Sequence, residues 1–114
     1  MEKWTDEGTL QVRRIGETCR IHLAGDLDDY AVERFPPAEI VAAGGDFQAI
    51  ILDLTELQYI DSSGLRWLLR VHRAARAKGR QMTAYVRQEA TVYRTLQLIG
   101  AGDVFPVEFV GGEP

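Results

Sequence analysis

The chain has 114 residues, 46% of them hydrophobic and 26% charged, with a formal net charge of −4; this is the composition of one soluble globular domain, long enough to bury its own core. The acidic balance argues against nucleic acid and anionic lipid as partners, because both need a basic face on the protein. No run reaches the ~18 apolar residues of a membrane span, and the acidic start MEKWTDEG is unlike a signal peptide, so we expect a cytoplasmic protein without direct membrane insertion.

Two short runs of strand-forming residues follow an extension of residues 1–7. TLQVRR and TCRIHLAG are joined by IGE, which predicts a β-hairpin. Cys19 lies on the same face of the second run as Ile21 and Leu23. We therefore expect a buried apolar side chain rather than a redox or metal site.

The next segment, GDLDDY, is rich in carboxylates and is expected to be a loop, in which Asp28 or Asp29 caps the turn that follows. Residues 30–43 have a helical pattern but contain two adjacent prolines, Pro36 and Pro37. Proline is tolerated in the first turn of a helix and not in its interior. The sequence therefore predicts a short helical turn before the prolines and a second helix that begins near them.

The second half of the chain alternates between strands and helices. AIILDL is continuously apolar, as expected of a central strand covered on both faces. A helix is predicted from Ser62 to Lys78, followed by the strand QMTAYV and a helix in EATVYRTLQLIG, with Gly79 and Gly100 as the stops. In the last strand, VFPVEF, Pro106 indicates a sheet edge.

The predicted order is strand, strand, helix, strand, helix, strand, helix, strand. This alternation predicts one α/β domain over residues 8–110, with a mixed, mainly parallel β-sheet and helices packed against it. Residues 111–114 are left as a C-terminal tail.

A helical wheel separates the side chains of the helix after Asp61. The core face is expected to comprise Leu65, Leu68, Leu69, His72 and Ala75, and a stripe of Arg66, Arg70 and Arg73 is expected to point to water. Ser62 falls on the leucine side, so it should face inward or cap the helix. Ser63 falls beside Arg66, Trp67 and Arg70, so its hydroxyl should open onto solvent, and Trp67 should be only partly buried. Capping accounts for Asp61 and Ser62 but leaves Ser63 unexplained.

The segment LDLTELQYIDSSGLRWLL resembles the signature of the STAS domain of bacterial anti-sigma factor antagonists: an apolar strand, a polar turn, then Asp-Ser-Ser-Gly-Leu opening a helix. LAGDLD, at residues 23–28, is similar to the family's acidic loop after its hairpin. The resemblance extends over residues 8–110. Two features depart from the family pattern: Arg66 stands where a small residue is common, and the proline pair interrupts a helix that is usually continuous.

The resemblance implies a binding module whose second serine, here Ser63, is phosphorylated by a kinase-fold anti-sigma factor and dephosphorylated by a serine phosphatase. The unphosphorylated module would hold that partner, and the phosphorylated module would release it. The expected partner-binding residues are Asp26, Asp28, Asp61, Ser62, Ser63, Gly64, Arg66, Trp67 and Arg70. The two arginines would either recognise an acidic partner or pair with the phosphate.

No catalytic constellation is evident. His22 alternates outward on a strand, His72 falls on a core face, and neither has a spacing that links it to a serine. There is no phosphate-binding loop and no cluster of metal ligands, so neither a cofactor nor a metal is expected. The alternatives left open are a non-catalytic subunit of a stress-sensing assembly or of a membrane transporter complex. We expect a monomer or a weak homodimer.

Overall fold

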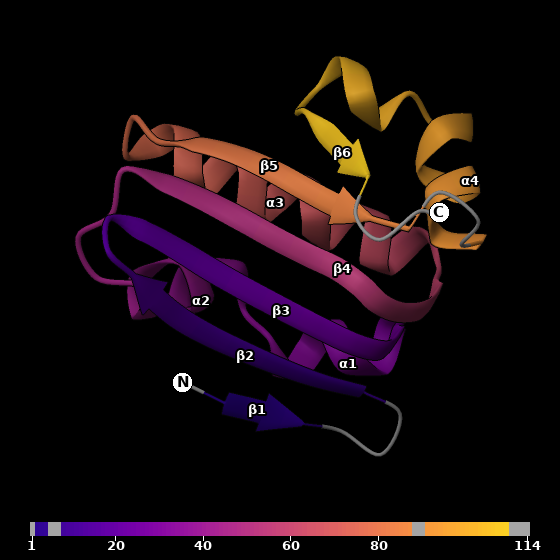
Figure 1. Cartoon of the computed structure of the whole chain (residues 1–114). Helices are drawn as coiled ribbons and strands as arrows, with labels where there is room; N and C mark the ends of the chain where they lie inside the picture. The colour runs from indigo at the N-terminus through magenta and orange to yellow at the C-terminus, as the bar shows by residue number, and fades with distance from the viewer. Residues whose placement is uncertain (1, 5–7, 88–90, 110–114) are drawn as a thin grey trace.

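The fold is seen in a computed structural model that describes residues 2–4, 8–87 and 91–109. Its strands form one sheet in the order β1-β2-β3-β4-β5-β6. The first two neighbouring pairs are antiparallel and the other three are parallel, which confirms the mixed, mainly parallel α/β sheet (Figure 1). The strands are β1 (Glu2–Trp4), β2 (Gly8–Ile15), β3 (Thr18–Leu27), β4 (Ala49–Ile60), β5 (Gln81–Val86) and β6 (Val107–Phe109).

Two of these strands lie at the edges of the sheet. β1 falls within the predicted extension and pairs with β2, so the sheet has one strand more than expected. β6 follows Pro106 at the opposite edge, as the proline indicated.

The helices are α1 (Asp29–Arg34), α2 (Pro37–Ala43), α3 (Ser62–Ala77) and α4 (Thr91–Leu98), with a short 3-10 helix, η1 (Ala101–Asp103). The proline pair separates α1 from α2, and Pro37 is the first residue of α2, as predicted. α3 ends before Gly79, whose φ of 71° is the left-handed conformation expected after a helix.

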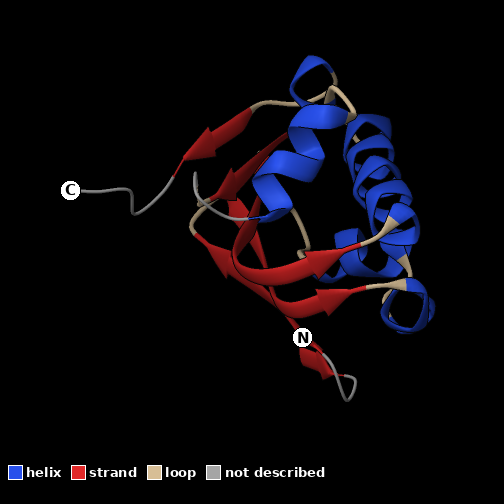
Figure 2. Ribbon diagram, turned by 90° about the vertical axis from the view of Figure 1, so that its right-hand side faces the viewer, coloured by secondary structure: helices blue, strands red, loops and turns tan. Residues whose placement is uncertain are grey.

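All four α-helices lie on one side of the sheet (Figure 2). This follows from the strand order. From β3 to β6, each connection leads to the neighbouring strand in the same direction across the sheet. Because such connections between parallel strands are right-handed, their helices all lie on the same face of the sheet. The prediction that residues 49–54 are covered on both faces is therefore wrong. Ile50, Leu52 and Leu54 enter the core, whereas Asp53 alternates onto the face without helices.

The core lies between the sheet and the helices. Cys19 is fully buried there, as predicted, and burial raises the pKa of its thiol. The largest fully buried side chains include three aromatic residues, Phe35, Trp67 and Phe105.

Two strands extend further than the sequence indicated. β3 continues to Leu27, through the first half of the expected GDLDDY loop, and β4 continues to Ile60, through the expected polar turn. The register between them shifts twice, between His22 and Ala24 and between Gly25 and Asp26. These irregularities let the two strands stay paired to their ends and bring the residues that follow them together.

Candidate functional site

The candidate site lies where β3 and β4 end side by side, next to α1 (Figure 1). Each strand is followed at once by an aspartate that begins a helix. The Asp28 Oδ1 atom accepts a hydrogen bond of 2.9 Å from the Ala31 backbone N–H, and Asp61 Oδ1 accepts one of 3.0 Å from the Gly64 N–H. Both are N-cap bonds, as predicted for these positions.

Asp61 also links the two helix starts. Its second oxygen, Oδ2, accepts a hydrogen bond of 3.2 Å from the backbone N–H of Asp29, at the start of α1. Its own backbone N–H donates to the Leu27 carbonyl at 3.4 Å. Both carboxylate oxygens are thus used inside the fold, and Asp61 has a structural role.

Gly64 allows the start of α3 to approach the end of β3 closely. A Cβ atom at this position would lie 2.2 Å from the Leu27 carbonyl oxygen and 2.6 Å from Ile60 Cγ1. A glycine is therefore required here by space rather than by backbone conformation.

The Ser63 hydroxyl lies between two side chains of opposite charge. Its Oγ atom donates to Asp29 Oδ1 at 3.4 Å and accepts from Arg66 Nη2 at 3.4 Å. Both distances are long for hydrogen bonds, so these contacts are weak. Ser63 forms part of the wall of an open hollow of about 230 Å³, which we call the Ser63 hollow. Its lining residues are Asp29, Val32, Glu33, Pro37, Ser63, Arg66, Trp67 and Arg70.

The predicted exposure of the two serines is wrong in part. Ser62 is exposed rather than inward, and it is the first residue of α3 rather than its cap. Ser63 is half-buried in the wall of the hollow rather than fully open to solvent. Its hydroxyl nevertheless faces a hollow that opens to solvent, not the packed core.

Trp67 was expected to be only partly buried, but it is 2% exposed. Its indole Nε1–H donates to the Phe35 carbonyl, at the end of α1. The buried face of α3 is therefore centred on Gly64, Trp67, Leu68, Val71 and Ala75. It is wider on the Trp67 side than the wheel predicted, because α3 packs against α1 and α2 as well as the sheet. Leu65 and Leu69 are consequently half-buried, at the other margin of this face.

The acid that reaches Ser63 is Asp29, which the sequence analysis considered only as a possible cap. Asp28 uses its carboxylate to cap α1, and Asp26 lies in β3 opposite Tyr59 of β4. Arg66 contacts Ser63, and Arg70 lines the Ser63 hollow. Their roles in partner binding stay predictions.

His72 was expected on the core face, and it is half-buried at its margin. Its ring lies 5.6 Å from that of Phe105, and its buried Nδ1 atom has no hydrogen-bond partner among the described residues. Burial lowers the pKa of His72, and the charge of Arg76 adds to this effect.

A second polar cluster, missed by the sequence analysis, lies on the sheet face without helices. Asp53, only 6% exposed, accepts hydrogen bonds from Arg20 at 2.7 Å and from Thr55 Oγ1 at 2.6 Å. His22 connects it to Glu56, with Nδ1 3.1 Å from Asp53 and Nε2 2.7 Å from Glu56. Burial alone would raise the pKa of Asp53, but hydrogen bonds from Thr55, Arg20 and His22 outweigh it and hold the pKa well below its usual range.

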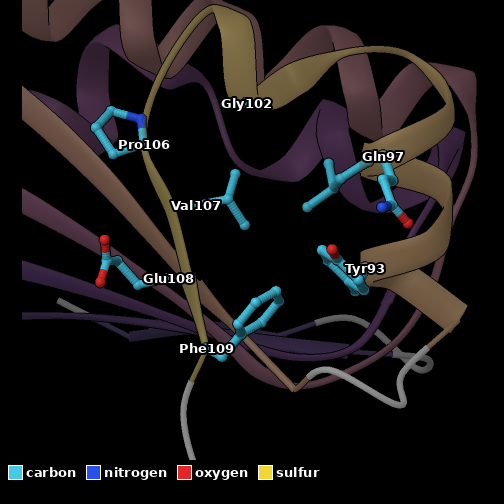
Figure 3. A pocket seen from close by; sticks show the side chains of 8 residues that line it. Tyr93, Gln97, Gly102, Pro106, Val107, Glu108 and Phe109 are labelled. Carbon is cyan, nitrogen blue, oxygen red and sulfur yellow. The ribbon is translucent and has the colours of Figure 1, made fainter.

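A further cavity, of about 400 Å³, lies between α4 and β6 and shares no residue with the Ser63 hollow. Figure 3 shows Tyr93 and Gln97 on the α4 side and Val107 on the β6 side, with Phe109 at one end. The rings of Tyr93 and Phe109 meet edge to face, with centroids 4.8 Å apart. Within the described ranges, no group of acidic, histidine or cysteine side chains is placed to hold a metal ion, and no helix is long and apolar enough to cross a membrane.

Comparison with known proteins gives the same family as the sequence motifs. The family model described as "Mlab, STAS domain" matches residues 10–109. The anti-sigma-B factor antagonist of Listeria monocytogenes is 25% identical over 93 residues, which cover 82% of this chain and 81% of that protein.

Solved structures of anti-sigma factor antagonists have a similar fold. An anti-sigma factor antagonist from Mycobacterium paratuberculosis has a TM-score of 0.72 at 19% identity, over 90% of this chain and 86% of that one. The Bacillus cell fate determinant SpoIIAA, in its phosphorylated form, has a TM-score of 0.65 at 24% identity, over 89% of this chain and 90% of that one. The chain therefore belongs to the STAS domain family and is similar to anti-sigma factor antagonists.

Proposed function

We propose that this protein is an anti-sigma factor antagonist, a binding module that holds a kinase-fold anti-sigma factor when Ser63 is unmodified and releases it when Ser63 is phosphorylated. The observation that carries the proposal is the position of the Ser63 hydroxyl, in the wall of an open hollow at the start of α3. The similarity to SpoIIAA, a protein with a phosphorylated form, supports it.

Phosphorylation at this position leaves the fold intact. The helix start is held by Asp61 and Gly64, while the Ser63 hydroxyl makes two weak contacts among the residues that the structure describes. A phosphoserine adds about −1.5 to −2 charges and three strong acceptor oxygens. Its effect therefore falls on a protein docked over the hollow, because burying an unpaired dianion in an interface is strongly unfavourable.

The proposed docking surface surrounds the Ser63 hollow and takes in Asp26, Ser62, Arg66 and Arg70. Trp67 supports the hollow from inside and is too deeply buried to be an interface hot spot. An exposed aromatic residue suited to that role is Tyr30, beside Asp29, which is 48% exposed. The guanidinium of Arg34 lies 5.1 Å from the centre of its ring and helps to hold it in place.

The test is phosphotransfer from ATP by candidate kinase-fold anti-sigma factors, with the modified residue mapped by mass spectrometry. The wild-type chain and Ser62→Ala should be labelled, and Ser63→Ala should not. Ser62→Ala is the matched control because it removes a neighbouring, more exposed hydroxyl from the same helix turn. Labelling that persists in Ser63→Ala contradicts the assignment. A chain that no such kinase labels or binds would instead fit a subunit of a sensor or transporter assembly.

A further inference from the structure

We propose that the Ser63 hollow is an intramolecular phosphate-binding site, in which Arg66 and Arg70 hold the phosphoryl group attached to Ser63. This inference rests on the proposed function for the modification itself, but its geometry can be tested without a kinase or a partner. It decides between the two roles that the sequence left open for these arginines.

Arg66 already contacts the atom that would carry the phosphate. Its Nη2 atom is 3.4 Å from Ser63 Oγ, and Arg70, one helical turn further along α3, lines the same hollow. Neither arginine forms an ion pair within 4.0 Å in the part of the chain that the structure describes. Both are exposed and can therefore turn toward a new anion.

The hollow has room for the group. Its volume of about 230 Å³ is well above the ~10–15 Å³ of accessible space that a cavity needs to hold one water. This leaves space beside Ser63 for a phosphoryl group of one phosphorus and three oxygens. Guanidinium groups bind such oxygens through parallel N–H bonds, which favours arginine over lysine here.

The two acids that line the hollow repel a phosphate at Ser63, and their effect on its titration can be tested. Asp29 accepts the Ser63 hydroxyl proton in a hydrogen bond, and a phosphorylated Ser63 has no such proton to donate. Asp29 is exposed, so its carboxylate can turn away from the phosphate while its backbone N–H stays bound to Asp61. Glu33 is the other acid in the lining. The charged side chains that line the hollow are thus Asp29, Glu33, Arg66 and Arg70.

The consequence is a switch in which the phosphate acts on a docked protein in two ways, by taking up space in the Ser63 hollow and by its charge. A phosphate held against its own helix occupies part of the hollow beside Ser63, and the two arginines partly neutralise it. A docked protein would then lose the space beside Ser63 and the two cations. This differs from a phosphate that projects freely from the surface and repels a partner only by its charge.

The experiment uses the full chain with phosphoserine incorporated at position 63, titrated by 31P NMR. The second pKa of free phosphoserine is about 6. Arg66→Gln should raise the titration midpoint relative to the wild-type chain by about half a unit or more, because a neighbouring cation stabilises the dianion. Arg70→Gln should raise it by less, and Asp29→Asn should lower it. All these differences should shrink in 1 M salt.

Arg73→Gln is the matched control, because Arg73 is an exposed arginine of the same helix outside the hollow. It should leave the midpoint within about 0.1 unit of wild type, and urea-unfolded samples of all variants should titrate alike. An Arg66→Gln midpoint equal to that of Arg73→Gln would overturn the proposal, whatever the outcome of the kinase assay. Conversely, failure of every kinase to label Ser63 would reject the proposed function and leave this titration unaffected.

Discussion

Gly64→Ala should destabilise the protein strongly, although alanine is the better helix former. The new methyl carbon would lie 2.2 Å from the Leu27 carbonyl oxygen, whereas real Cβ contacts stay above 3.0 Å, so α3 must move by about 0.8 Å. Overpacking of this kind costs about 2–3 kcal/mol. The displacement also weakens the bonds that join Asp61 to the start of α1 and to the end of β3, which adds about 1–2 kcal/mol. The higher helix propensity of alanine offsets about 1 kcal/mol.

The net loss is therefore about 3 kcal/mol, or about 12 °C in Tm for a domain of this size. Urea unfolding followed by circular dichroism measures it directly. Gly102→Ala is the matched control, because a Cβ at Gly102 meets nothing within 4 Å, and it should change stability by less than about 0.5 kcal/mol. Equal unfolding midpoints for the two variants would refute the claim that the start of α3 is fixed against β3.

Two pH profiles test the other unusual side chains. Asp53→Asn should lower stability by about 2 kcal/mol at pH 7, because Arg20 loses its ionic partner. The pKa of Asp53 is depressed in the fold. Wild-type stability should therefore fall as the pH drops below about 5, where the unfolded carboxylate begins to take up protons. The Asp53→Asn variant should lose stability less steeply over the same acid range. The pKa of His72 is lowered by burial, so the wild type should also lose stability as the pH falls through about 6.5, and His72→Phe should be flatter between about pH 7 and pH 5. Urea unfolding midpoints measured across the pH range give both profiles. If a variant's profile runs parallel to that of the wild type, the pKa shift assigned to that residue is contradicted.

Local patterns were enough to predict most of the elements. The proline pair indicated the break between α1 and α2, because proline is excluded from a helix interior whatever surrounds it. Asp61 was recognised as a cap for a similarly local reason. These predictions needed only neighbours within a few residues, and the structure confirms them.

The errors share a different cause, which is packing between distant segments. Trp67 is buried where α3 packs against α1 and α2 and bonds to the Phe35 carbonyl, 32 residues away, and no helical wheel of α3 contains that contact. The uncovered face of β4 depends on three successive crossovers in one direction. Asp53, the fifth residue of AIILDL, was a local sign that this face was polar.

The separation of Asp29 and Ser63 along the chain, 34 positions, has a consequence for timing. Their meeting requires the parallel pairing of β3 with β4 along its full length, so no short peptide that contains the serine reproduces the surface around it. An enzyme that recognises both helix starts would ignore nascent or denatured copies and modify only chains that had completed the sheet. Each modified molecule would thereby report that it had reached its native state.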